Sequence, residues 1–170
     1  MKRILITLCA LLTVIIVSAG TMNITSGSKK FLKTAGTMLI TFNWDKALWA
    51  NGETLQHRWQ EEYNKHIEEG EAAFIKGFNE EGKQLKATAK HDNADYTTEV
   101  EIQKIDYFFS ATSIIPGHKH DIWAKVTVKD KQGNTVCEIV IERMKGGRDF
   151  VVYDSYIKMM KKLGEELASL

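Results

Sequence analysis

The sequence predicts an α+β fold, a two-layer α/β sandwich. Its mixed, mostly antiparallel sheet of about five strands should be covered on one face by a long helix and a C-terminal helix. Residues 84–142 are dominated by alternating apolar and polar side chains, the period of two that is typical of strands. Residues 52–81 and the segment after 148 instead repeat apolar side chains every three or four positions, as amphipathic helices do. Because each helix has a single apolar stripe, both can pack on the same face of one sheet.

The first strand and the long helix are predicted between residues 38 and 81. Residues 38–44 alternate Met, Ile, Phe and Trp with Leu, Thr and Asn, which indicates a strand with one face inward. The helix at 52–81 contains Gly70 and Gly77, and each glycine costs about 1 kcal/mol relative to alanine. We therefore expect a break at Gly70 and a C-terminal cap at Gly82. The apolar stripe of this helix consists of Leu55, Trp59, Tyr63, Ile67, Phe74 and Phe78.

The remaining strands are predicted between residues 85 and 141. A short strand at 85–89 and a turn at 92–95 precede a long strand that starts at Tyr96. Its inward parity changes between Ile102 and Ile105, which predicts a bulge near Gln103 and Lys104. Residues 122–128 and 137–141 then form a hairpin around the turn 130–134.

The last helix is predicted to follow a loop at 145–148, with Asp149 as its N-terminal cap. Its polar face carries lysines and glutamates, as a helix in contact with water requires. Its apolar stripe consists of Tyr153, Tyr156, Ile157, Met160, Leu163 and Leu167.

The N-terminal residues 1–20 have the pattern of a secretion signal. Lys2 and Arg3 precede an apolar run of residues 4–17, and Ser18-Ala19-Gly20 supplies the small residues of a cleavage site. We expect a signal peptide at 1–20, a flexible leader at 21–35 and a single α+β domain at 36–170. A retained membrane anchor is the alternative reading of the same run. After removal of the signal no membrane-spanning segment is expected.

Composition limits the classes of function. Without residues 1–20 the chain keeps 21 of its 23 basic side chains against 22 acidic ones, a net charge of −1. A near-neutral domain lacks the basic surface expected of a nucleic-acid-binding protein. Of the two cysteines, Cys9 lies in the signal, and Cys137 alone can form no intramolecular disulfide.

Five segments form a recognisable series along the chain: 74–81 (FIKGFNEE), 95–100 (DYTTEV), Ile114-Ile115-Pro116, 129–133 (KDKQG) and 146–150 (GGRDF). This series resembles an uncharacterised family of small exported proteins and lipoproteins of Bacteroidetes-type Gram-negative bacteria. The resemblance covers roughly residue 36 to the C-terminus and implies a periplasmic or envelope location and the two-layer fold. It implies no activity, cofactor or catalytic residue. Many members carry a lipobox cysteine at the end of the signal, which this chain lacks.

Histidines provide the candidate metal site. His118 and His120 are two apart at the start of a strand, so both can point to the same side and bind Zn²⁺. His91 would have to supply a third ligand. The alternative is a polar loop with solvated histidines, and no cofactor is predicted.

No pattern predicts an enzyme. His57 and Glu61 are four apart on the long helix without the H-E-x-x-H motif of zinc proteases, and with His66 they are read as side chains at the solvent edge. Gly146-Gly147-Arg148 could form an anion-binding nest, but the common role of such glycines is a turn. Cys137 falls on the inward parity of a strand, as a buried cysteine does.

Apolar residues in a loop and on the outward face of a strand favour an interaction surface. Ile114, Ile115 and Pro116 form an apolar loop, and Trp123 falls on the outward parity of the next strand. Grouped exposed apolar residues often mark a contact surface. The sequence therefore favours a non-enzymatic protein-interaction domain of the periplasm or outer membrane. Its partner would be an unknown envelope protein or a second copy of itself. A periplasmic module that binds a small ligand or a metal is the alternative.

Overall fold

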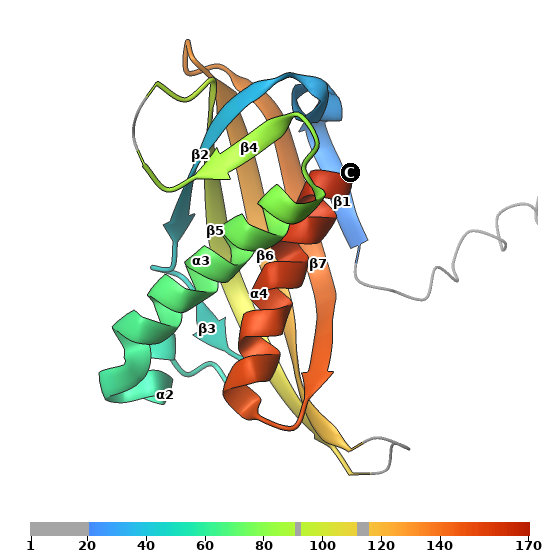
Figure 1. The fold of residues 1–170 in the computed structure, drawn as a ribbon. Coiled ribbons are helices and arrows are strands. Elements are labelled where there is room, and N and C mark those ends of the chain that lie inside the picture. Colours follow the sequence, from blue (N-terminus) through green and yellow to red (C-terminus); the bar gives the residue numbers. More distant parts are fainter. Residues whose placement is uncertain (1–20, 91–92, 112–115) are drawn as a thin grey trace, which may run out of the picture.

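Two long helices lie on a single face of one open sheet (Figure 1). The computed structural model describes residues 21–90, 93–111 and 116–170. The strands are β1 (Thr21–Gly27), β2 (Gly36–Asn43), β3 (Leu48–Trp49), β4 (Leu85–Thr88), β5 (Tyr96–Ser110), β6 (Gly117–Asp130) and β7 (Thr135–Asp149). The helices are α2 (Leu55–Trp59), α3 (Tyr63–Glu81) and α4 (Val152–Ser169), with the 3₁₀ helices η1 (Lys29–Lys33) and η2 (Gln60–Glu62). The predicted two-layer α+β architecture is confirmed.

The sheet is mixed, with the strand order β1-β7-β6-β5-β2-β4. Neighbours from β1 through β7 and β6 to β5 pair antiparallel, whereas β2 runs parallel to both β5 and β4. The two-residue β3 pairs parallel with β5 beyond the end of β2. The described residues thus form seven strands. The prediction of about five omitted β1 and β3, short segments with too few apolar residues to give a periodic signal.

The bulge predicted in β5 is confirmed. The pairing of β5 with β6 shifts by one residue between Ile102 and Lys104, so that Ile102 and Ile105 both face the core. The hairpin of β6 and β7 is confirmed as well, with Val126 opposite Ile139 and both side chains fully buried. Without the bulge, the second half of β5 would point its apolar side chains into water.

The predicted break of the long helix at Gly70 is wrong. The helix α3 runs without interruption from Tyr63 to Glu81, and the break lies at Gln60, whose φ is +47°. Gly70 serves packing instead, because a Cβ atom there would lie 2.2 Å from the Tyr156 hydroxyl of α4. Gly82 is the C-cap of α3, as predicted. None of the helices in the described ranges is long and apolar enough to cross a membrane.

Residues 21–35 differ from the expected flexible leader. They form the edge strand β1, paired antiparallel with β7, and then η1, whose Phe31 is buried against the core. The chain passes from β1 to η1 at Gly27. Glycine is needed there because φ is +75° and a Cβ atom would lie 2.0 Å from the Val136 carbonyl oxygen. The folded unit therefore includes residues that the sequence assigned to the leader.

The loop predicted at 145–148 is also wrong, since β7 continues through these residues to Asp149. Gly146 lies where β7 approaches α4, and a Cβ atom there would lie 2.8 Å from the Met159 Cβ. Asp149 is not the cap of α4 either. The N-cap is Val151, whose N–H donates to the Asp149 carboxylate at 3.2 Å.

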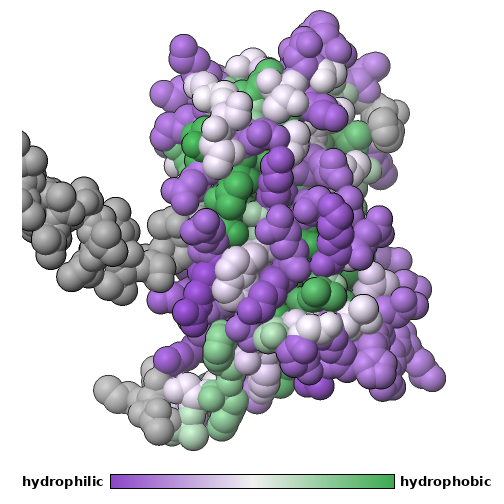
Figure 2. Space-filling view, turned by 180° about the vertical axis from the view of Figure 1, so that it is seen from behind, coloured by the Kyte–Doolittle hydropathy of each residue, from purple (hydrophilic) through white to green (hydrophobic). Residues whose placement is uncertain are grey.

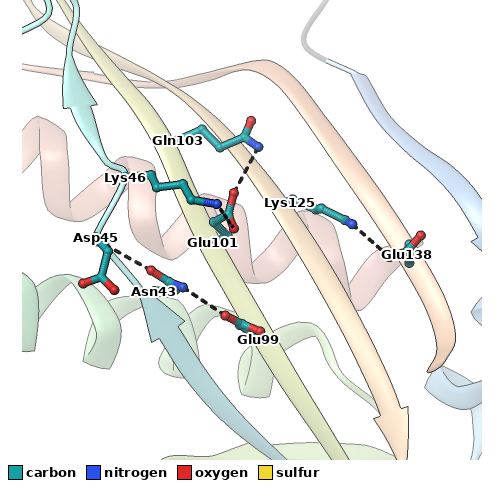
Figure 3. Close-up of polar contacts among 8 residues, drawn as sticks. All are labelled: Asn43, Asp45, Lys46, Glu99, Glu101, Gln103, Lys125 and Glu138. Carbon is teal, nitrogen blue, oxygen red and sulfur yellow. Dashed lines mark hydrogen bonds and ion pairs between the residues drawn. The ribbon is translucent and has the colours of Figure 1, made fainter. Parts of the chain in front are cut away.

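The face of the sheet that carries no helix is mainly polar. Seen from behind, it is largely hydrophilic with scattered hydrophobic areas (Figure 2). Glu99 accepts a hydrogen bond from Asn43 at 3.1 Å, and Glu101 lies 3.6 Å from the Lys46 ammonium group (Figure 3). Lys125 pairs with Glu138 at 2.9 Å in the same view (Figure 3). The carboxylates of this face are thus held by local partners.

Candidate functional site

A cavity lined mainly by aromatic rings lies between the sheet and the helices. Its volume is about 240 Å³. Its tryptophan and tyrosine rings come from four elements, β3, α2, β5 and α4. The strand β3 lies beside β5 after the bulge, α2 ends at the sharp turn of Gln60, and the first turn of α4 follows the end of β7. We call it the aromatic cavity; its rings include Trp49 of β3, Trp59 of α2, Tyr107 of β5, and Tyr153 and Tyr156 of α4.

These rings pack directly on one another. Trp59 contacts Trp49 and Tyr156 edge to face, with ring centroids 6.2 and 5.1 Å apart. Trp49 stacks on Tyr107 at 6.4 Å. Offset and edge-to-face pairs at such distances hold aromatic rings in place. The lining is therefore a preformed, rigid surface.

Two histidines complete the lining. His120 of β6 is buried, and its Nδ1 lies 2.7 Å from the hydroxyl of Ser155. That hydroxyl donates its own proton to the Val152 carbonyl oxygen at 2.7 Å, so Nδ1 of His120 must carry the proton and donate to Ser155. His66 of α3 packs edge to face on Trp59 at 5.0 Å.

Burial holds both histidines in the neutral form. Desolvation lowers the pKa of His120 to about 4, with a further lowering by His118 and a smaller opposing effect of Asp121. Desolvation also lowers the pKa of His66, although Glu62 acts against it. Neither imidazole contributes a positive charge to the aromatic cavity at neutral pH.

Two polar atoms of the lining lack a hydrogen-bond partner within the described residues. They are Nδ1 of His66 and the hydroxyl of Tyr153, both buried. The two rings are close, with centroids 4.7 Å apart. Leaving a buried polar group unpaired costs about 1–3 kcal/mol, so such atoms are uncommon in folded proteins.

Cations lie beside the aromatic cavity. The exposed guanidinium of Arg58 lies over the Trp49 ring at 5.5 Å and has no ion pair with any described residue. Lys65 lies 5.9 Å from the centre of the Tyr153 ring, but its ammonium group pairs with Glu62 at 3.2 Å. The lining contains no carboxylate in the described part of the chain.

A second feature lies at the same end of the molecule, where the β5–β6 hairpin projects and β7 turns into α4 (Figure 1). The ring of Phe109 is 57% exposed and packs on His118, which pairs across the sheet with Asp149. The next residue, Phe150, is 74% exposed. Hydrophobic side chains border the end of the hairpin in the space-filling view as well (Figure 2). We call this surface the apolar end; its residues are Phe109, Pro116, Phe150, Val151 and Val152.

The structure describes only part of the predicted interaction surface. Ile114 and Ile115 lie outside the described residues, while Pro116 is exposed directly before β6. Trp123 lies on the outer face, as predicted from its parity, but it is half-buried, and the Lys104 ammonium group lies 4.6 Å from its ring centre. Trp123 is therefore on the opposite side of the sheet from the aromatic cavity.

The histidines predicted to bind metal have other partners. His118 and His120 do lie on the same side of β6, but Nδ1 of His118 lies 2.5 Å from the Tyr107 hydroxyl and Nδ1 of His120 lies against Ser155. His91 lies outside the described residues. Among the residues that are described, no three His, Cys, Asp or Glu side chains are close enough together to hold a metal ion.

The helix histidines also differ from expectation. His57 pairs with Glu53 at 3.1 Å, since the break at Gln60 ends α2 before Glu61. His66, read from the sequence as a solvent-edge residue, lines the aromatic cavity. The sequence signal for this site was the density of aromatic residues, but the apolar stripes of the two helices accounted for Trp59 and Tyr156 as core residues.

The remaining candidates have structural roles. Gly146 and Gly147 are part of β7, where successive N–H groups point in opposite directions and cannot converge on an anion. Cys137 is buried, and desolvation raises the pKa of its thiol. Ser155 is fully buried, so its contact with His120 is closed to a substrate.

Comparisons with known proteins give distant likenesses. No family model matches the chain, and no curated protein matches it either. PelC from Paraburkholderia phytofirmans, solved as a dodecamer, is 12% identical with a TM-score of 0.48, over 88% of this chain and 97% of PelC.

A Xanthomonas campestris protein of the DUF330 family is 12% identical with a TM-score of 0.42, over 88% of this chain and 90% of that one. A homologue of a putative neuraminyllactose-binding hemagglutinin from Helicobacter pylori is 10% identical with a TM-score of 0.34, over 78% and 88% of the two chains. The resemblance to a Bacteroidetes-type exported family stays a prediction.

Proposed function

We propose that this protein is an exported, non-enzymatic binding domain whose apolar end joins it to a second copy of the chain. The observation that carries the proposal is the group of large apolar side chains exposed at one end, above all Phe109 and Phe150. Burying such side chains against a partner gains about 25 cal/mol for each Å² removed from water.

Charge at the apolar end favours a second copy as the partner. Asp149 pairs with Lys158, and Lys119 pairs with Asp121 at 3.3 Å. Asp121 also pairs with Arg143 at 3.1 Å, so each of these charged groups has an oppositely charged partner within the chain. Two identical surfaces can meet around a two-fold axis without bringing like charges together.

The pattern of residues 1–20 supports export to the periplasm or the outer membrane. A binding role rather than catalysis is supported by the buried serine and cysteine and by the locally paired carboxylates of the outer face. A metal-binding role draws less support, because His118 and His120 already use Nδ1 in contacts with Tyr107 and Ser155.

Light scattering after size exclusion tests self-association. We expect the exported protein to have about twice the mass of one chain, and Phe109→Ser/Phe150→Ser to be monomeric with an unchanged melting temperature. Intact mass spectrometry of the same sample, taken from the envelope fraction, should show cleavage near Ala19.

The control is Ile24→Ser/Leu48→Ser, because Ile24 and Leu48 are exposed apolar residues of other strands. It should keep the larger mass. A monomeric exported protein, or a double phenylalanine variant with the larger mass, would contradict the proposal.

A further inference from the structure

The aromatic cavity carries an inference that does not depend on self-association. We propose that it binds a small aromatic carboxylate, with the ring in the space that the aromatic lining encloses and the carboxylate on Arg58. Of the residues that the sequence singled out for metal or protein binding, the cavity shares His120, whose Nδ1 is already bonded to Ser155.

The size of the aromatic cavity limits the ligand to one ring or a fused pair. Pockets for drug-sized ligands have volumes of about 300–1,000 Å³. The volume of about 240 Å³ found here is slightly below that range. The surrounding rings already pack on one another, so a flat ring that enters the volume they line need not displace them.

The charged side chains beside the aromatic cavity indicate whether its ligand is an anion or a cation. An aromatic lining by itself would suit an organic cation. Here, however, Arg58 already occupies the face of Trp49, Lys65 lies over Tyr153, and the lining offers no carboxylate in the described residues. Because Lys65 is already paired with Glu62, a cationic ligand would meet the like charge of Arg58, whereas a carboxylate can form a two-pronged ion pair with the Arg58 guanidinium.

The unpaired polar atoms distinguish an aromatic acid from a sugar acid. A sugar ring brings several hydroxyl groups into the site, and each needs a hydrogen-bond partner. Within the described residues, the lining side chains have two polar atoms without a partner, Nδ1 of His66 and the Tyr153 hydroxyl. That number fits an aromatic ring with one hydroxyl or N–H group.

The test uses 4-hydroxyphenylacetate as the probe and follows the indole N–H signals of the four tryptophans by nuclear magnetic resonance. We expect the signals of Trp49 and Trp59 to shift and those of Trp44 and Trp123 to stay. A ligand of this size should bind with a Kd of about 0.1–1 mM. The neutral amide of the same compound should bind about tenfold more weakly, because it cannot pair with Arg58.

Two variants distinguish the loss of the Arg58 charge from a general effect of removing a cation from the protein. Arg58→Gln should weaken the acid about tenfold and leave the amide unchanged. The matched control is Lys104→Gln, which removes a cation from over a tryptophan ring on the other face of the sheet and should leave both affinities unchanged. Phe109→Ser/Phe150→Ser should also bind the acid normally, so that a failure of self-association and a failure of this site give different results.

Three outcomes would overturn the inference. They are the absence of shifts at Trp49 and Trp59 up to millimolar acid, equal affinity for acid and amide, and an Arg58→Gln variant that binds the acid as the parent does. Glucuronate that shifts these signals when the aromatic acid does not would assign the site to sugar acids instead.

Discussion

His120 shows how one buried side chain couples stability to pH. Its ring is enclosed by Trp49, Tyr107 and Tyr156 and donates to Ser155, and none of the described residues gives it a carboxylate partner on the inner face. A charge placed there would lose its hydration without gaining an ion pair. The folded protein therefore resists protonation of His120, and its pKa falls to about 4.

Acid should destabilise the protein through this residue. The unfolded chain protonates His120 near its ordinary pKa of 6.5, whereas the folded chain does so only near 4. Stability is complete above pH 6.5 and falls as the pH drops towards 4, by about 3 kcal/mol in all. The lowered pKa of His66 adds to this loss in the same direction.

Urea unfolding between pH 4 and pH 7 measures the effect. His120→Asn keeps a donor for Ser155 but does not titrate, so its stability should vary less with pH than that of the parent protein. The control is His57→Asn, because His57 is exposed, and it should follow the parent curve. An identical pH dependence in the parent and His120→Asn would refute this explanation.

At the level of elements, glycines set the distance between α3 and α4. A Cβ atom on Gly77 would lie 2.1 Å from the Lys161 carbonyl oxygen, and one on Gly164 would lie 2.1 Å from the Phe74 carbonyl oxygen. The two helices therefore touch backbone to backbone at these points. Alanine would force them apart and lift both from the sheet.

Gly164→Ala should reduce the free energy of unfolding although alanine is the better helix former. Alanine gains about 1 kcal/mol of helix propensity, but the overpacking costs more, and we expect a net loss of about 1–2 kcal/mol in urea unfolding. The exposed Asn64 of α3 provides the control, because Asn64→Ala should change stability by less than about 0.5 kcal/mol. A Gly164→Ala variant as stable as the parent would mean that the helices can separate at no cost.

For the whole molecule, β1 closes one side of the sheet. It pairs with the segment of β7 from Cys137 to Glu142, and Met22 packs against the core. Without β1, the backbone N–H and C=O groups along that side of β7 would be open to pairing with another chain.

A chain that begins at Ser28 should therefore melt at a lower temperature than one that begins at Thr21, and it should aggregate as its concentration rises. Thermal unfolding and light scattering measure both effects. Equal melting temperatures and equal masses for the two chains would show that β1 is dispensable. The comparison needs no variant of the apolar end, so it does not depend on the proposed self-association.

The sequence by itself determined the fold class, the bulge in β5, the β6–β7 hairpin and the amphipathic character of α3 and α4. These features depend on local periodicity, which a chain displays residue by residue. The parity change between Ile102 and Ile105 is the clearest case, because only one extra residue in the strand can explain it.

Only the tertiary structure decided where the helix breaks, where β7 ends and which side chains form the site. Gly70 had the local signature of a break, but its contact with Tyr156 outweighs that preference. The aromatic cavity joins residues from β3, α2, α3, β5, β6 and α4, and each has an ordinary core role within its own element. A cavity arises where packed elements fail to fill the space between them, and that depends on distances between distant segments that no local pattern encodes.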